Sequence, residues 1–292
     1  MRQFFPVEEL ARDERFSTIT MRDRMNDPRA GGAGANAASQ PKRANTRLAP
    51  DRHDASDAAR ALMHGIFVGE IQALEGAGRT CWDFPTASGK TVAADEAPFE
   101  LKLDMARQCW DEARHVEISV KLADWMGSEI GEFAENTVLF EAACSHDPVL
   151  RLAGVNRALE GLAIDVFTTM KEFGDLAGDP FLEFCEDWML ADEVTHVKMG
   201  SDWLRRLTDK DPGRRQQALE FQAVVDKLFS YGGQRSDSMD SIFGLARRFR
   251  ELAGFTEDEI EEIAEISNTA LLEAKERRAR LRQEAAAALG YQ

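Results

Sequence analysis

The chain has 292 residues and a formal net charge of −16 at pH 7. Such an acidic protein repels phosphate backbones and anionic lipid headgroups, so nucleic acid and membrane surfaces are poor candidates for its main partner. The composition is rich in Ala, Leu, Glu, Arg and Asp and lacks sustained alternation of β-branched residues, which predicts an all-α protein. Four scattered cysteines without CxxC spacing, and the lack of a signal peptide or membrane span, favour the cytoplasm.

Residues 1–53 are predicted to form an N-terminal arm. Its first 28 residues are expected to dock as short helices, and residues 29–50, which lack apolar periodicity, indicate a flexible connector. A first long helix is predicted from about residue 54 to 78, with Gly76 and Gly78 marking its end.

Three further long helices are predicted over residues 98–125, 149–173 and 181–207. Residues 128–147 are expected to form a long crossover that contains a short helix. The order is therefore hairpin, crossover, hairpin, which resembles the connectivity of ferritin-like four-helix bundles. We expect this bundle to span residues 54–208.

The remaining residues, 209–292, are predicted to form additional helices that pack on the bundle. These helices are expected near residues 213–231, 238–253 and 257–288. The last has a clear start signal, because Thr256 followed by Glu259 matches a capping box.

Two of the five histidines follow a glutamate by three residues, and an aspartate precedes each of these glutamates. Two matches with the same preceding aspartate are rarely accidental. A spacing of three residues places carboxylate and imidazole on one helix face, close enough to share a metal ion. The two strings are Asp111-Glu112-Ala113-Arg114-His115 and Asp192-Glu193-Val194-Thr195-His196.

A dimetal site in a bundle needs one more glutamate from each of the other two helices. The first and third helices offer similar strings, Glu70-Ile-Gln-Ala-Leu-Glu75 and Glu160-Gly-Leu-Ala-Ile-Asp165. The matched register favours the first acid of each string, with Glu75 or Asp165 as the alternative ligand. Two divalent cations would neutralise four buried carboxylates. The predicted ligands are Glu70, Glu112, His115, Glu160, Glu193 and His196.

The first string, from Asp111 to His115, resembles the DExRH motif of di-iron carboxylate oxygenases and acyl-carrier-protein desaturases. The string that starts at Glu70 is similar to a bacterial branch of the ferritin-like superfamily, and the resemblance covers roughly residues 54–208. By analogy, Glu112 and Glu193 bridge two metals, while Asp111 and Asp192 hydrogen-bond the histidine of the opposite motif. Thr195 stands where the first motif has Arg114, so the ion pairs around the site need not be symmetric.

The resemblance implies a non-haem di-iron oxygenase or oxidase that activates O2 and oxidises a small organic substrate. It implies two iron ions, with manganese or a mixed Mn/Fe pair as alternatives, and no catalytic residue beyond the ligands. A separate reductase or ferredoxin would supply electrons, because the sequence carries no flavin, haem or iron–sulfur motif. A homodimer is expected.

Other functions remain open. A ferroxidase or iron-storage protein would be a compact chain, and this chain is longer; a dimanganese catalase is a further alternative. A radical-generating subunit needs a tyrosine beside the metals, whereas the only two tyrosines are Tyr231 and Tyr291, outside the ligand helices. The acidic charge argues against a tRNA-hydroxylating enzyme.

Several residues near the motifs have an ordinary structural interpretation. Trp110 and Trp188 are predicted to pack in the core, with electron transfer as the alternative. His64 and His146 are predicted to cap helices or lie at the surface. One apolar set either lines a substrate cavity or belongs to the plain core: Phe67, Ala73, Ala163, Ile164 and Phe167.

Overall fold

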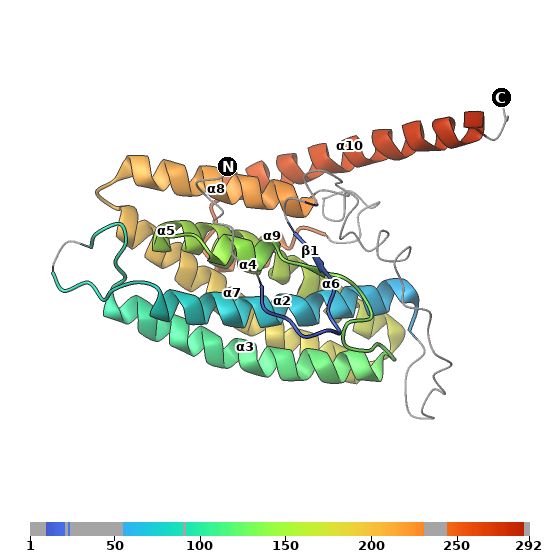
Figure 1. Cartoon of the computed structure of the whole chain (residues 1–292), viewed down its shortest axis with the longest axis horizontal. Coiled ribbons are helices and arrows are strands. Elements are labelled where there is room, and N and C mark those ends of the chain that lie inside the picture. Colours follow the sequence, from blue (N-terminus) through green and yellow to red (C-terminus); the bar gives the residue numbers. More distant parts are fainter. Residues whose placement is uncertain (1–9, 21–22, 24–54, 90–91, 231–243, 289–292) are drawn as a thin grey trace.

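The computed structural model describes residues 10–20, 23, 55–89, 92–230 and 244–288 and shows a mostly helical protein (Figure 1). This agrees with the all-α prediction. The whole predicted connector, residues 29–50, and both tyrosines lie outside the described residues. None of the helices in the described part of the chain is long and apolar enough to cross a membrane.

Four long helices lie side by side and hold the main apolar core (Figure 1). Helix α2 (Asp57–Trp82) packs along α3 (Phe99–Trp125), and α6 (Glu160–Ala177) packs along α7 (Pro180–Thr208). Contacts between α3 and α7 join the two pairs. The hairpin of α6 and α7 turns at Gly178, whose φ of 66° requires the left-handed conformation that glycine adopts readily.

Helix α2 continues to Trp82, beyond the end that the sequence predicted. Gly76 and Gly78 do not stop the helix. A Cβ atom at Gly76 would lie 3.1 Å from Ala143 Cβ, and one at Gly78 would lie 3.7 Å from Cys109 Sγ. Gly76 therefore allows a close approach to Ala143, whereas the distance at Gly78 is an ordinary contact that a side chain would tolerate. Sequence reasoning mistook both glycines for a stop signal.

The predicted third helix is built from three consecutive segments. These are α5 (Pro148–Arg151), the π-helical segment η2 (Leu152–Leu159) and α6. A π-helix widens the helical turn, and such segments are frequent at functional sites. Segment η2 ends directly before Glu160, one of the predicted ligands.

The crossover between α3 and α5 carries a short strand and a short helix, β2 (Glu135–Asn136) and α4 (Val138–Ala143). Strand β1 (Thr18–Ile19) pairs in parallel with β2. In the described residues 10–20, the prediction of short helices is therefore wrong. This segment is held by Arg12, which lies 2.8 Å from both Glu75 Oε1 and Glu135 Oε1.

In the described part of the chain, three helices follow the four long ones: α8 (Pro212–Ser230), α9 (Arg247–Leu252) and α10 (Glu257–Ala288). Residues 231–243 lie outside the described part, so the predicted helix at 238–253 is seen only as α9. The predicted capping box is confirmed, because the backbone N–H groups of Thr256 and Glu259 each donate to the other's side chain. The division into arm, bundle and C-terminal helices stays a prediction.

Candidate metal centre

The structure brings all six predicted ligands together in the middle of the long helices. Two groups form, and in each group one candidate ligand atom from every residue lies within 4.8 Å of the others. Glu112 and Glu193 belong to both groups, as bridging carboxylates would. All six side chains are buried. The first group is Glu70, Glu112, His115 and Glu193, and the second is Glu112, Glu160, Glu193 and His196.

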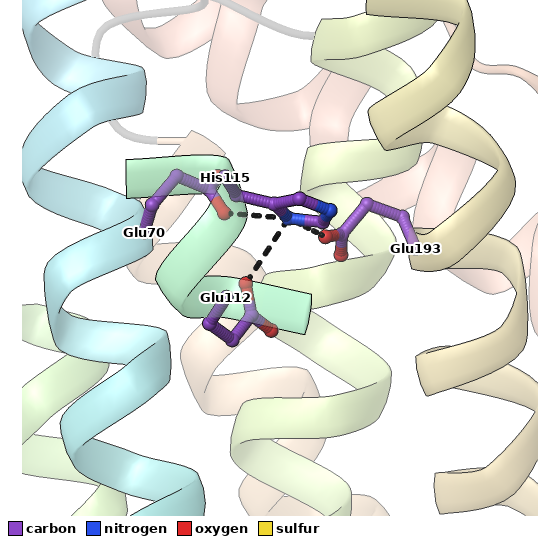
Figure 2. Close-up of side chains that lie close together, drawn as sticks. All are labelled: Glu70, Glu112, His115 and Glu193. Carbon is purple, nitrogen blue, oxygen red and sulfur yellow. Dashed lines mark hydrogen bonds and ion pairs between the residues drawn. The ribbon is translucent and has the colours of Figure 1, made fainter. Parts of the chain in front are cut away.

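Three carboxylates converge on one nitrogen of His115 (Figure 2). Its Nδ1 lies 3.1 Å from Glu70 Oε2 and 3.2 Å from both Glu112 Oε2 and Glu193 Oε1. A single N–H group can donate well to only one of these oxygens. A cation shared by the nitrogen and the three carboxylates would satisfy all of them.

The second group is arranged around His196 in the same way. Its Nδ1 lies 3.2 Å from Glu112 Oε1, 3.6 Å from Glu193 Oε1 and 3.8 Å from Glu160 Oε2. Both histidines thus direct Nδ1 toward the shared carboxylates.

Several buried polar atoms of the cluster are unpaired, and they indicate whether a metal fits this arrangement. Glu112 Oε2, both carboxylate oxygens of Glu193 and His196 Nδ1 are buried without a hydrogen-bond partner among the described residues. Leaving such groups unpaired is costly, and native proteins rarely do so. Divalent cations would pair with all four atoms. Carboxylate and imidazole donors suit first-row metals such as iron, manganese and zinc.

The outward nitrogens of the two histidines contact the aspartates that the sequence placed there. His115 Nε2 lies 3.3 Å from Asp192 Oδ2, and His196 Nε2 lies 3.3 Å from Asp111 Oδ2. Each contact crosses between α3 and α7, as predicted. An aspartate on Nε2 holds the proton there and leaves the Nδ1 lone pair for a metal.

Arg114 links the two aspartates. Its Nη2 donates to Asp111 and lies 3.3 Å from Asp192 Oδ2. Its guanidinium carbon lies 4.7 Å from the centre of the Trp188 ring, which itself stands edge-on to the His115 ring at 6.2 Å. Trp188 therefore packs against the site. The prediction that Trp110 packs in the core is wrong, because Trp110 is 68% exposed.

Two polar residues of the site were missed by sequence reasoning. Gln108 Nε2 donates to Glu112 Oε1 and to Glu160 Oε1, each at 3.0 Å. Asn156 Nδ2 in turn donates to Gln108 Oε1 at 2.8 Å. Each lies four residues before a predicted ligand on the same helix face, which is the signal that could have found them.

The electrostatics of the cluster are those of a site that holds protons in place of cations. Burial opposes charge on both imidazoles, yet the surrounding carboxylates raise the pKa of His115 and of His196 well above the usual value. Burial also raises the pKa of Glu70 and Glu160, helped by the charges on Glu112 and Glu193. The four groups with raised pKa values therefore hold protons to higher pH than they would in solution, and each such proton offsets part of the negative charge of the cluster.

The alternative ligands lie elsewhere. Glu75 pairs with Arg12, and Asp165 accepts from Arg250 Nη2 at 2.5 Å in a fully buried pair. His64 is buried and accepts from the Gly131 N–H at 2.9 Å, so its surface assignment is wrong, whereas His146 is exposed as predicted.

The apolar residues predicted either to line a cavity or to belong to the core are buried or partly buried: Phe67, Ala73, Ala163, Ile164 and Phe167. Phe167 lies next to the site, with its ring 6.4 Å from the His115 ring and nearly perpendicular to it. The Phe167 ring therefore provides an apolar surface directly beside a candidate ligand.

Comparison with known proteins gives two matches. An uncharacterised protein of Haemophilus influenzae is 26% identical over 211 residues, which cover 72% of this chain and 69% of that protein. No solved structure matches the chain. A family model described as "Protein of unknown function (DUF455)" matches residues 4–261, most of the chain and all six candidate ligands, so the chain belongs to this family.

Proposed function

We propose that the chain is a ferritin-like di-iron oxygenase or oxidase that uses O2 to oxidise a small organic substrate. The observation that carries this proposal is the sharing of Glu112 and Glu193 between two adjacent groups of ligands. Glu112 and Glu193 would hold two metals close enough together for both to contact one bound molecule. The mostly carboxylate ligand set suits the hard, oxidised states of iron.

The side chains of this protein would hold the metals and set their surroundings. Glu70 and His115 would complete one metal position, and Glu160 and His196 the other. Two bound iron ions would supply the redox chemistry, reducing O2 with electrons from an external donor such as a reductase or ferredoxin. Asp111 and Asp192 would keep each imidazole in the tautomer that offers Nδ1.

The surroundings of the cluster support chemistry that excludes bulk water. Glu112, His115 and Glu193 are 0% exposed, so reactive species would be shielded from solvent. Phe167 would provide an apolar surface for the substrate beside His115. We further propose that the protein acts in the cytoplasm as a homodimer.

The first experiment measures the metal content of the purified protein and of two alanine variants. We expect two iron ions per chain in the wild type, and loss of metal with retained helical circular dichroism in Glu112→Ala and Glu193→Ala. Glu117→Ala is the matched control, because Glu117 lies on α3, is exposed, and pairs only with Lys121 among the described residues. Full metal occupancy in both site variants would contradict the assignment.

The second experiment tests the chemistry. The iron-loaded protein is reduced without oxygen and mixed with O2 in a stopped-flow spectrometer. A transient visible absorbance band supports oxygen activation. Manganese in the purified protein, together with disproportionation of hydrogen peroxide, would instead identify a catalase, and assembly into a large shell would identify an iron-storage protein.

A further inference from the structure

A buried carboxyl group lies near the cluster but outside both groups of ligands. Glu186 on α7 is 0% exposed, and neither of its carboxylate oxygens has a hydrogen-bond partner among the described residues. One turn before and one turn after it, Leu182 and Met189 belong to the main apolar core. An acidic side chain in such surroundings is costly unless it has a role.

A second unpaired polar group lies on the facing helix. Ser119 on α3 is also 0% exposed, and its hydroxyl lacks a partner in the described part of the chain. It follows His115 by four residues, so both side chains lie on the same face of α3. The bundle interior beside the cluster therefore contains two unsatisfied polar groups in an otherwise apolar region.

The pairing of α3 with α7 places these two groups on the same side of the cluster. Asp111 contacts His196 and His115 contacts Asp192, so the helices run antiparallel. Four residues forward from His115 lead to Ser119, and six residues back from Asp192 lead to Glu186. At about 1.5 Å per residue, Ser119 lies about 6 Å from His115 along the bundle axis, and Glu186 lies about 9 Å from Asp192 in the same direction.

The Glu186 carboxyl is suited to carry a proton. Burial raises its pKa to about 8, although the charge of His115 acts in the opposite direction. The charged group that acts on it is His115 from α3, and the Glu186 carboxylate in turn helps burial to raise the pKa of the neighbouring Cys185 thiol. The group is therefore mostly protonated at neutral pH and holds a proton that it could donate.

We propose that Glu186 is a proton donor for the candidate dimetal site, connected to it by a buried water molecule and the Ser119 hydroxyl. A water bonded to both side chains would satisfy their unpaired atoms. This inference rests on the proposed reaction with O2, whose reduction consumes protons. Glu186 does not touch the ligands in the described contacts, so it would act without binding metal.

The proton transfer can be written in full. The O–H bond of Glu186 breaks and its proton passes to the water, which gives one of its own protons to Ser119 Oγ. The Ser119 proton moves to an oxygen atom of O2, which receives its electrons from the external reductase or ferredoxin. Glu186 then recovers a proton from solvent.

The first test needs no turnover. The infrared difference spectrum between the metal-free wild type and metal-free Glu186→Gln removes the carboxyl bands that both proteins share, such as those of Glu70 and Glu160. It should show a protonated carboxyl band that disappears with a midpoint near pH 8. Anaerobic loading with Fe(II) at neutral pH should leave this band in place in the wild type, because the metals displace protons of the ligands and Glu186 keeps its own proton for the reaction with O2. The matched control is Glu183→Gln, one turn away on α7 and partly exposed, which should behave as the wild type.

The second test measures the reaction with O2. Glu186→Gln and Ser119→Ala should bind the wild-type amount of iron but react at least about tenfold more slowly, because the proton donor or its relay is missing. Wild-type rates in both variants, or an ionised Glu186 at pH 7 in the metal-free or the iron-loaded protein, would overturn the proposal. Loss of iron from Glu186→Gln would also overturn it, by making Glu186 a ligand. A wild-type protein that binds iron but does not react with O2 would instead contradict the proposed function, while the infrared result still reports on Glu186.

Discussion

At the scale of single residues, the contact between Asp192 and His115 sets which imidazole nitrogen is available. The carboxylate lies 3.3 Å from Nε2 and so directs the Nδ1 lone pair at the cluster. Asp192→Asn should weaken metal binding about 10- to 100-fold, because the imidazole loses its charged partner. Competition with a chromophoric chelator measures this affinity.

The control for this prediction is another aspartate on the same helix. Asp187 is exposed and pairs with Lys171 at 2.5 Å, so Asp187→Asn should bind metal as the wild type does. Equal losses in both variants would show that the effect comes from the charge of α7 as a whole rather than from the contact with His115.

The sequence predicted residues whose spacing repeats and missed those whose role depends on a neighbouring helix. The glutamates and histidines form two similar strings, so the two halves of the site support each other. Gln108 and Asn156 belong to no repeated string, and their contact joins α3 to η2 across the bundle. Glu186 was missed for the same reason, since a glutamate on a helix is normally exposed and only packing reveals its burial.

At the scale of helices, the packing of α7 against the π-helical segment η2 fixes the position of Asn156. A Cβ atom at Gly200 would lie only 2.4 Å from Asn156 Cβ. Gly200→Ala should therefore push α7 and η2 apart, lower the free energy of unfolding by about 1–3 kcal/mol, and disturb the bond from Asn156 to Gln108. The thermal unfolding temperature and the metal affinity should both decrease.

Gly65→Ala is the matched control for this change. Gly65 lies in α2, is exposed, and has no atom within 4 Å of the position its Cβ would take. Alanine there should stabilise the protein by roughly 0.5–1 kcal/mol, because it favours the helix. A stable Gly200→Ala variant with wild-type metal affinity would show that the close approach at Gly200 is unimportant for the site.

Helix existence was predictable from apolar periodicity and start signals, whereas helix ends and irregularities were not. Segment η2 has the same apolar character as the helices around it, so periodicity gave no sign of its π-helical turns. The strand pairing of β1 with β2 joins residues more than a hundred positions apart. Pairings of this kind depend on the folded crossover and carry no local signal.

At the scale of the whole molecule, the candidate metals join α2, α3, α6 and α7, so metal binding and folding are linked. The unfolded chain cannot assemble all six ligands, and metal should therefore stabilise the folded state. Free metal at about a thousand times its Kd contributes about 4 kcal/mol per site. For a chain of this size that corresponds to a rise in Tm of roughly 8 °C or more.

The size of this stabilisation should increase with pH. In the metal-free folded protein the raised pKa values of Glu70, Glu160, His115 and His196 let these groups hold protons to higher pH than usual. Metal must displace these protons, so acid weakens binding and base strengthens it as long as the pH lies below these pKa values. The gain in Tm on adding metal should thus be much larger near pH 8 than near pH 5.5.

Scanning calorimetry with and without a chelator measures this gain in Tm. The double variant Glu112→Ala/Glu193→Ala, which lacks both shared carboxylates, should show no gain at either pH. A gain that is independent of pH would mean that metal binds at groups that are already deprotonated, away from this cluster.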